Sequence, residues 1–179
     1  MSFVLGFAGS NSSTSINYQL TRYTISLVRS SETRLLDMAD HSFPMYSQDY
    51  EKEYGFSDTL IGFNKDIQNA KGIILSVNEH NSNPSAYFKN VIDWLSRMER
   101  KFIEGKKVLL MSTSPGKRGG KSALEITEKM LSRFGATITG TFSLSAFYDN
   151  FDVNKGILDP DLAKEHARVL NNFLDTIHD

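Results

Sequence analysis

Short apolar runs alternate with longer amphipathic stretches along the whole of this 179-residue chain. Some of the short runs are continuously aliphatic, such as Ile73-Ile74-Leu75 and residues 108–111. A strand that is apolar at every position is typical of a parallel sheet covered by helices on both faces, because a strand with one face in water alternates apolar and polar residues. The pattern therefore predicts an α/β fold with a buried parallel sheet.

Five strands and five helices are predicted from this alternation. The strands are expected at residues 3–8, 33–37, 72–77, 107–112 and 137–144, and the helices at residues 15–29, 57–69, 85–100, 121–134 and 160–177. Gly135 is a typical residue to end the fourth helix, and Asp159-Pro160 is a typical start for the fifth. Because no internal repeat, low-complexity tract or linker interrupts the alternation, residues 1–179 are expected to form one domain, a three-layer sandwich.

The composition excludes several classes of function. A formal net charge of −1 leaves no basic excess for a nucleic-acid or membrane partner. The chain has no Cys, which excludes disulfides, thiol nucleophiles and cysteine metal sites, and its four His residues show no metal-ligand spacing. We therefore predict no metal site. With no signal-peptide pattern at the start and no apolar run of about 18 residues, a cytoplasmic protein is expected.

A loop rich in small polar residues follows the first predicted strand, in the segment Gly9-Ser10-Asn11-Ser12-Ser13-Thr14-Ser15-Ile16-Asn17. Unpaired backbone N–H groups at the start of a helix, together with the helix dipole, bind phosphate, and short side chains there can encircle it without a Lys or Arg. An ordinary N-cap is the alternative, but a cap needs one Ser or Thr, and five lie between Ser10 and Ser15. The candidate phosphate-binding residues are Gly9, Ser10, Ser12, Ser15, Ile16 and Asn17.

Two further polar loops follow the third and fourth predicted strands, at residues 78–85 and 112–120. In open parallel sheets, ligands bind beyond the carboxyl ends of the strands, where the strand order reverses, so the three loops are expected to meet in one site. For either loop alone, helix-start and turn residues are an equally good explanation. The candidate cofactor-binding residues in these loops are Asn78, Glu79, His80, Asn81, Ser114, Pro115, Gly116, Gly119 and Gly120.

The motifs of these loops resemble those of one known family. Residues 114–120 match the pattern Ser-x-Gly-x-x-Gly-Gly, and residues 9–17 match a Gly-Ser start followed by Ser15 and Asn17. Residues 78–81 and 88–94 are similar to Pro-Glu-Tyr-Asn followed by Leu-Lys-Asn-x-Ile-Asp-Trp. By these motifs, in this order, the chain resembles the NAD(P)H-dependent FMN reductases of the flavodoxin-like superfamily, which include quinone, azo-dye and chromate reductases.

The resemblance implies a flavodoxin-like fold, with a five-stranded parallel sheet in the order 2-1-3-4-5. It also implies FMN as cofactor, NADPH or NADH as electron donor, and a small soluble acceptor such as a quinone, free flavin or azo compound. A homodimer, or a homotetramer built from dimers, is the implied assembly. In such an enzyme the flavin carries the chemistry, so no catalytic triad is expected. The alternative is a flavodoxin-like electron carrier or a non-catalytic flavin-binding protein.

The chain departs from the family pattern at three positions. Ser12 stands where the family commonly has Arg, and Asn78 and His80 replace the Pro and Tyr of the second loop. The family's Tyr is expected to lie against the flavin ring, and an imidazole can stack in the same place. A protonated His80 there would stabilise negative charge on the reduced flavin, whereas the alternative is an ordinary surface histidine.

Several other groups of residues have candidate roles. Residues 38–56 are predicted to form a long connecting loop, and the resemblance implies that its aromatic residues line the site or a subunit contact. Lys117-Arg118 is a candidate for binding the phosphates of the dinucleotide, with solubility as the alternative. Phe88 and Trp94 are predicted to lie in the core or an interface. Candidates for an oligomer contact after the last strand are Phe142, Phe147, Tyr148 and Phe151.

Overall fold

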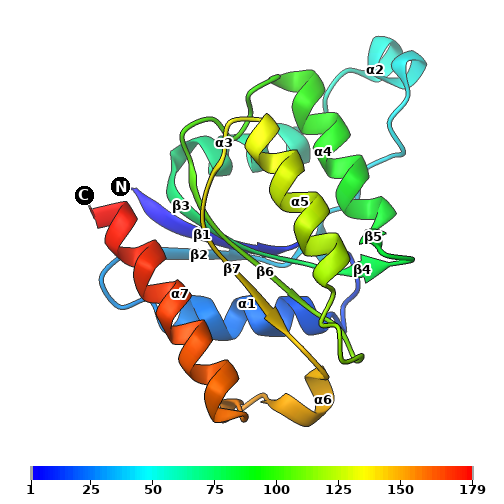
Figure 1. Ribbon diagram of the computed structural model, residues 1–179. Coiled ribbons are helices and arrows are strands. Elements are labelled where there is room, and N and C mark those ends of the chain that lie inside the picture. The colour runs from blue at the N-terminus through cyan, green and yellow to red at the C-terminus, as the bar shows by residue number, and fades with distance from the viewer. Residues whose placement is uncertain (1, 179) are drawn as a thin grey trace.

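The computed structural model describes residues 2–178, and a five-stranded parallel sheet forms its centre (Figure 1). The strands lie in the order β2-β1-β3-β6-β7. Their bounds are Phe3–Ala8 for β1, Thr33–Leu36 for β2, Ala70–Val77 for β3, Lys107–Thr113 for β6 and Thr137–Leu144 for β7. Counted among these five strands alone, the order is 2-1-3-4-5, so the predicted flavodoxin-like topology is confirmed.

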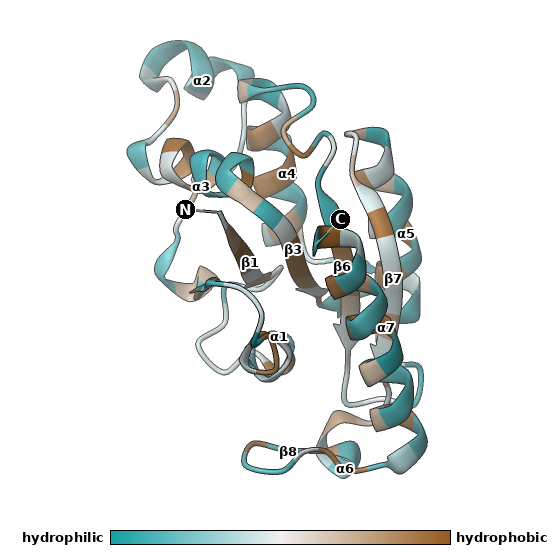
Figure 2. Ribbon diagram, turned by 90° about the vertical axis from the view of Figure 1, so that its left-hand side faces the viewer, coloured by the Kyte–Doolittle hydropathy of each residue, from teal (hydrophilic) through white to brown (hydrophobic). Residues whose placement is uncertain are grey.

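Helices cover both faces of the sheet and make two separate hydrophobic cores. The bounds are Ile16–Ser26 for α1 and Pro160–His178 for α7 on one face, and Asp58–Asn69 for α3, Ala86–Met98 for α4 and Lys121–Arg133 for α5 on the other. Successive residues of a strand point to opposite faces, so Ile73 joins the α3–α5 core and Ile74 joins the α1–α7 core. Two buried faces explain why the central strands are apolar throughout, as Figure 2 shows for β1 and β3.

The helix boundaries follow local capping signals. Gly135 has a φ of +103° directly after the last turn of α5, and the Asp159 carboxylate accepts hydrogen bonds from the Asp161 and Leu162 N–H groups at the start of α7. Both predicted signals are therefore confirmed. The first helix is shorter than predicted and ends at Ser26, because the Leu27 and Val28 N–H groups bond three residues back and tighten its last turn.

The segment at residues 38–56 is not the long loop that the sequence predicts. It contains a 3₁₀ turn, η1 (Met38–Asp40), and a two-turn helix, α2 (Gln48–Tyr54), which projects from the layers in Figure 1. Both helices are capped by side chains, those of Asp37 and Ser47. No residue of α2 is buried, so the sequence lacked the apolar stripe by which a helix is recognised.

The short remaining elements lie at the ends of the sheet. They are β4 (Glu79–His80), β5 (Asn83–Pro84), α6 (Phe147–Asn150), β8 (Phe151–Asp152) and β9 (Gly156–Ile157). Within the described range, no helix combines the length and the apolar character needed to cross a membrane.

The aromatic residues divide between the core and the surface. Phe88 and Trp94 are each 2% exposed, so their predicted place in the core is confirmed. Of the four aromatic residues proposed for an oligomer contact, Phe142, Phe147 and Phe151 are buried in the α1–α7 core, whereas Tyr148 is 71% exposed. Only Tyr148 is therefore free to take part in such a contact.

Candidate flavin site at the carboxyl edge of the sheet

The three polar loops meet at the carboxyl edge of the sheet, as predicted, and the Asn17 side chain joins them. Its Nδ2 donates to the Thr113 carbonyl at 3.1 Å. Its Oδ1 accepts from the Thr113 N–H at 3.0 Å and from the Ser76 hydroxyl at 2.7 Å. Asn17 is 2% exposed, so its side chain ties α1 to the ends of β3 and β6. Because the Asn17 side chain is already bonded within the protein, the group of Asn17 that is available to bind a phosphate is its backbone N–H.

The first loop delivers backbone donors to the start of α1. Ser15 is the N-cap, and its hydroxyl accepts from the Tyr18 N–H at 3.1 Å. The N–H groups of Ile16 and Asn17 lie in the first turn, where a helix offers no internal acceptor. No atom of residues 2–178 accepts a hydrogen bond from either group. Two directed donors at the positive end of the α1 dipole are the chemistry that binds an anion.

Hydroxyl groups surround these donors, and none of the loop's side chains carries a positive charge. Ser10 Oγ accepts from the Ser12 N–H at 3.3 Å, and Ser12 Oγ accepts from the Thr14 N–H at 3.3 Å. Ser12 and Thr14 are exposed, whereas Ser10 and Ser15 are nearly buried. The loop is therefore folded on itself by its own hydroxyls, with Ser12 and Thr14 open to a bound group.

Gly9 fixes the loop against the next helix. A Cβ at Gly9 would lie 2.9 Å from Cδ2 of Phe88, closer than real contacts allow. The Ser85 hydroxyl donates to the Gly9 carbonyl at 2.8 Å and accepts from the Phe88 N–H at 3.1 Å, which caps α4. Glycine is therefore required at this position because it lets the loop pack against α4, and the predicted part of Gly9 in phosphate binding stays a prediction.

The second loop is a hairpin made of β4 and β5. Asn81 and Ser82 connect the two strands with φ values of +51° and +61°, the conformation of a tight two-residue turn. Glu79 points inward, and its carboxylate accepts from the Ala123 N–H at 3.0 Å in the first turn of α5. The N-cap residue of α5 is Gly120, which has no side chain, so Glu79 supplies the cap from another loop.

Asn78 and His80, the residues that replace Pro and Tyr, contact each other. Asn78 Nδ2 and His80 Nε2 lie 3.1 Å apart, and the His80 ring is exposed. The Oδ1 atom of Asn78 is buried, and no partner for it exists in the described part of the chain. A buried carbonyl oxygen without a donor is costly to maintain, which favours a bound group with a hydrogen-bond donor at this point.

The third loop owes its shape to two glycines. Gly119 and Gly120 have φ values of +60° and +77°, and a Cβ at Gly119 would lie 3.0 Å from the Leu144 backbone. The Gly119 carbonyl accepts from the hydroxyls of Ser112 (2.7 Å) and Ser143 (3.0 Å). Gly116 differs, because only one atom, Ser114 Oγ at 3.8 Å, lies near its Cβ position. The space over Gly116 is therefore open to a ligand.

Bonds to the following segment hold this loop in place. The Ala146 N–H donates to the Gly116 carbonyl at 2.9 Å, and the Phe147 N–H donates to the Ser114 carbonyl at 3.1 Å. Lys117 and Arg118 are exposed at the tip, and Arg118 donates to the Ser122 hydroxyl. Pro115 is exposed beside them.

Sequence reasoning missed the polar residues that end the strands. Ser76, Ser112 and Thr113 are buried, yet each forms a hydrogen bond that positions a loop. A polar residue at the carboxyl end of an apolar run is the signal that identifies such positions.

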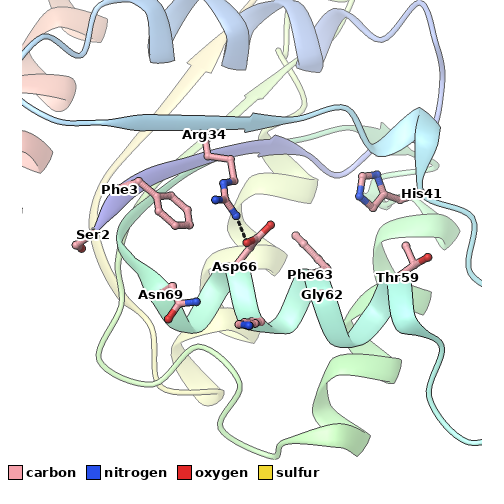
Figure 3. A pocket seen from close by; sticks show the side chains of 10 residues that line it. Ser2, Phe3, Arg34, His41, Thr59, Gly62, Phe63, Asp66 and Asn69 are labelled. Atoms are coloured by element: carbon pink, nitrogen blue, oxygen red, sulfur yellow. Dashed lines mark hydrogen bonds and ion pairs between the residues drawn. The ribbon is translucent and has the colours of Figure 1, made fainter.

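A large cavity lies away from the three loops. It has a volume of about 880 Å³ and runs between β2 and α3, where Arg34 and Asp66 form an ion pair across it (Figure 3). The Arg34 guanidinium also lies 4.3 Å from the centre of the Phe3 ring. None of the predicted site residues lines this groove, which follows from the position of β2 at the uncovered edge of the sheet.

The site residues fit a flavin mononucleotide. The α1 N-terminus and its hydroxyls suit a phosphate, the buried Asn78 Oδ1 suits an N–H donor of the ring, and the open space over Gly116 suits a flat group. Fold and loops together define a class: doubly wound α/β proteins with polar loops at the switch point of the sheet, where this architecture places its ligands.

Comparison with known proteins identifies the family within that class. Residues 3–149 match the NADPH-dependent FMN reductase family, and the chain belongs to it. The chain is 27% identical over 154 residues to an uncharacterized protein of Mycoplasma pneumoniae. This alignment covers 83% of this chain and 90% of that protein. The chain is also 36% identical over 77 residues to a quinone reductase of Escherichia coli K12. This shorter alignment covers 43% of this chain and 41% of that enzyme.

Solved structures agree with this assignment at the level of the fold. FerB, a flavoenzyme NAD(P)H:(acceptor) oxidoreductase from Paracoccus denitrificans, has a TM-score of 0.79 at 22% identity, with 99% of this chain and 98% of that chain covered. Membership of the family confirms the predicted class of function, an oxidoreductase that uses FMN and NAD(P)H.

Proposed function

We propose that this reductase transfers electrons from NAD(P)H through FMN to a quinone or a similar small soluble acceptor, and that the three loops at the carboxyl edge of the sheet hold the flavin. The observation that carries the proposal is the pair of unbonded N–H groups at Ile16 and Asn17, directed from the start of α1. The Escherichia coli relative is named a quinone reductase, and the aligned part of it includes less than half of that enzyme, so the acceptor is part of the proposal.

The phosphate would be held by backbone and hydroxyl groups. The Ile16 and Asn17 N–H groups donate to it, and Ser12 and Thr14 provide hydroxyl donors beside them. Bound FMN supplies the hydride and electron transfer. The protein orients the group and leaves one side of it open to the donor or the acceptor.

The second and third loops would hold the ring. Glu79 holds the hairpin against α5, and this fixes the backbone between Asn78 and His80. In this arrangement the exposed His80 imidazole lies against the flavin, and in its protonated form it stabilises negative charge there. Gly116 lets the third loop approach the ring closely, and Lys117 and Arg118 bind the phosphates of the dinucleotide.

We further propose a cytoplasmic homodimer. The reducing cytoplasm suits a chain without Cys. The exposed aromatic residues of residues 38–56 favour an assembly of more than one copy.

Absorption spectroscopy tests the electron-transfer function. The protein is incubated with FMN, desalted, and mixed with NADPH without oxygen and then with a quinone. Retained flavin absorbance that NADPH removes and quinone restores is the expected result. Retained flavin that stays oxidised would instead indicate the electron carrier, and absence of retained flavin would reject the cofactor site.

A backbone substitution tests the phosphate site directly. Ile16→Pro removes one proposed donor, while proline is tolerated at the first position of a helix and Ser15 already has the extended backbone (φ −60°, ψ 119°) that must precede it. We expect FMN binding to weaken by roughly 10-fold, the loss of one hydrogen bond to a charged group. Ile16→Ala is the matched control, since it shortens the same side chain and keeps the N–H. Equal FMN affinity in the two variants would show that the phosphate is bound elsewhere.

A further inference from the structure

Two of the residues that depart from the family pattern contact each other in the second loop. Asn78 lies directly after β3, and His80 lies in β4, which projects beyond the sheet in Figure 1. Asn78 Nδ2 lies 3.1 Å from His80 Nε2. A Pro in place of Asn78 has no side-chain donor, so the family's Pro and Tyr could not form this hydrogen bond. The pair is therefore a feature of this chain's own sequence.

The contact determines which nitrogen of His80 carries a hydrogen. An amide nitrogen has two hydrogens and accepts no hydrogen bond, so Asn78 Nδ2 is the donor and His80 Nε2 is the acceptor. A neutral imidazole that accepts at Nε2 carries its hydrogen at Nδ1. The same contact fixes the Asn78 amide, because a turn of 180° would bring Oδ1, a second acceptor, against the Nε2 lone pair. While its ring is neutral, the exposed His80 thus holds the Asn78 side chain in one orientation.

This orientation leaves Asn78 Oδ1 as an acceptor without a donor. The atom is buried, and no partner for it exists among residues 2–178. Val77 of β3 pairs with Ser112 of β6, so Asn78 lies beside the end of β6, where the third loop begins. The N–H of Thr113, the next residue of β6, already donates to Asn17 Oδ1 at 3.0 Å. The protein therefore presents a buried acceptor between the loops, and a ligand has to supply the donor.

The oxidised flavin ring has one group that can supply it. Its two carbonyl oxygens and its unsubstituted ring nitrogens without hydrogen are acceptors, and the single N–H group, between the two carbonyls, is its only donor. An acceptor of the ring placed against Asn78 Oδ1 would leave two sets of lone pairs facing each other. The hydrogen-bonding requirement of Asn78 therefore matches the N–H edge of the ring and no other edge.

We propose that Asn78 selects the N–H edge of the oxidised flavin through Oδ1, and that His80 is the positioning residue that holds the Asn78 amide in the orientation this requires. The inference rests on the proposed flavin function and deepens it by assigning a specificity-determining side chain. It also gives the neutral form of His80 a task that is separate from the one proposed for its protonated form.

Binding of two flavins to the ligand-free protein tests the contact at Asn78. One is FMN, and the other is FMN methylated at the ring N–H, which has lost the donor. Fluorescence titration gives the two dissociation constants. We expect wild type to bind the methylated flavin roughly 10-fold more weakly, because Oδ1 is then left buried without a donor. Asn78→Leu keeps the size of the side chain without its polar atoms, so the ratio of the two constants should fall to about 2 or less.

A second variant and a matched control separate the parts of the proposal. His80→Phe keeps a flat ring and removes the acceptor for Asn78 Nδ2, so the ratio should fall to about a third of the wild-type value or less. Ile16→Pro is the control, because it removes a proposed phosphate donor on another loop. This control should weaken the binding of both flavins equally and leave their ratio at the wild-type value.

The tautomer of His80 is measured without any flavin. Long-range proton–nitrogen NMR spectra are recorded at about pH 8.5, where an ordinary imidazole is neutral. We expect the hydrogen at Nδ1 in wild type. In Asn78→Leu we expect it at Nε2, the tautomer that an unrestrained imidazole favours.

Each other result has a definite meaning. Equal binding of the two flavins by wild type, or a wild-type ratio in Asn78→Leu, would overturn the role of Asn78 and leave the flavin function in place. A wild-type ratio in His80→Phe, or a hydrogen at Nε2 in the wild-type protein, would overturn the role of His80. Absence of FMN binding by wild type would reject the flavin function itself, and with it the contact to the ring.

Discussion

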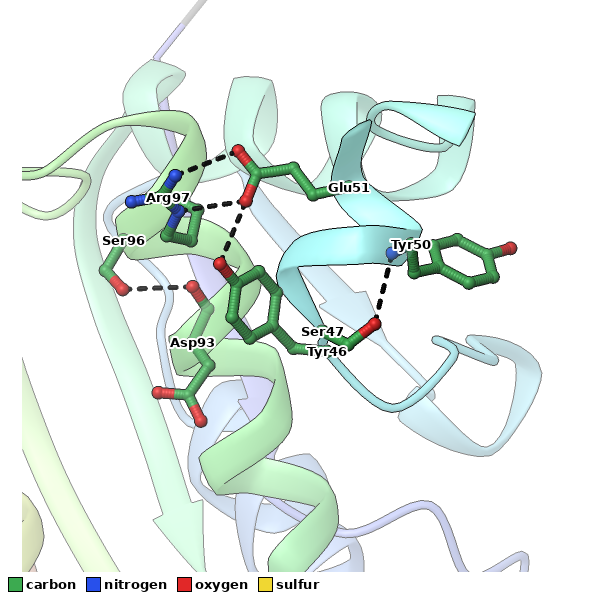
Figure 4. A network of polar contacts seen from close by, with 7 residues as sticks. All are labelled: Tyr46, Ser47, Tyr50, Glu51, Asp93, Ser96 and Arg97. Atoms are coloured by element: carbon green, nitrogen blue, oxygen red, sulfur yellow. Dashed lines mark hydrogen bonds and ion pairs between the residues drawn. The ribbon is translucent and has the colours of Figure 1, made fainter. Parts of the chain in front are cut away.

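The carboxyl edge of the sheet and the segment from Met45 to Tyr54, here called the arm, both lie at the surface, yet they are held in different ways. At the edge, buried side chains bond to backbone groups of neighbouring loops, as Asn17 does with Thr113 and Ser85 with Gly9. In the arm, Glu51 is held by an ion pair with Arg97 and by the Tyr46 hydroxyl (Figure 4), and the Tyr46 N–H donates to Asn90 Oδ1 at 2.8 Å. Hydrogen bonds shielded from water fix a geometry, whereas exposed pairs contribute little and are replaced easily. The edge therefore has a fixed geometry without a ligand, and the arm is held more weakly.

Removal of Asn17 tests the edge most severely. Asn17→Ala leaves the Ser76 hydroxyl and both backbone groups of Thr113 without partners in a buried place. We expect the free energy of unfolding in urea to fall by roughly 3 to 5 kcal/mol, since each unsatisfied group costs about 1 to 3 kcal/mol. Asn11→Ala changes an exposed asparagine of the same loop and should stay within about 0.5 kcal/mol of wild type. A small loss for Asn17→Ala would erase the contrast between the two regions.

The third loop offers a paired test with two glycines. Gly119→Ala combines a positive φ with a clash against the Leu144 backbone, and we expect a loss of about 3 kcal/mol in the free energy of unfolding. Gly116→Ala meets open space and should change it by no more than about 0.5 kcal/mol. Similar values for the two variants, measured by thermal or urea unfolding, would contradict the fixed geometry assigned to this loop.

A buried titratable group lies between α1 and α7, whereas no titratable residue of the arm is buried. His166 of α7 is 1% exposed, lies 2.8 Å from the Thr24 hydroxyl of α1, and is flanked by Tyr23 and Phe142. Burial lowers its pKa to about 4, from 6.5 in the unfolded chain. Between pH 6.5 and pH 4, His166 is therefore protonated in the unfolded chain but neutral in the folded protein. The free energy of unfolding consequently decreases as the pH falls from 6.5 towards 4.

A substitution isolates this contribution. At pH 5 we expect the linkage to cost about 2 kcal/mol relative to pH 7.5, and His166→Gln to lose about 2 kcal/mol less than wild type over that interval. His80→Gln, at an exposed histidine, should keep the wild-type dependence. Urea unfolding at the two pH values measures the difference, and parallel curves for wild type and His166→Gln would disprove it.

The arm should respond least. Arg97→Met removes the ion pair with Glu51 and keeps most of the side chain's length, so the global free energy of unfolding should change by less than about 1 kcal/mol. Amide exchange in α2 should accelerate, while exchange in β3 and β6 stays unchanged. Arg133→Met is the matched control on α5, outside the Glu51 contact. A large global loss for Arg97→Met would place the arm among the stabilising parts of the fold.

The sheet and its covering helices could be predicted because their residues obey local rules. Continuous apolar runs such as residues 108–111 occur only where both faces are buried, and Gly135 and Asp159 marked helix ends by their own chemistry. The helix α2 was not predicted, because it lacks such local signals. It buries nothing, and its one signal, the N-cap Ser47, is too common to identify a helix alone.

At the candidate site, the sequence predicted the three loops but not the hydrogen-bond partner of each side chain. Position along the chain revealed that Asn17 and Glu79 lie at the edge, but their partners are 96 and 44 residues away. A contact over that distance depends on the strand order, which no local pattern contains. Both residues lie at the expected edge and their side chains hold other loops in place, and their direct part in cofactor binding stays a prediction.

Some residues at the carboxyl edge join two parts of the molecule and others are exposed, and this difference determines which positions tolerate substitution. Asn17, Glu79, Ser85 and Gly119 each bind two parts of the molecule together, so a substitution at any of them disturbs more than one loop. The exposed residues His80 and Pro115 do not join two loops in this way. Substitutions at such exposed positions are therefore expected to change what the site accepts at a smaller cost in stability than substitutions at the residues that join two loops.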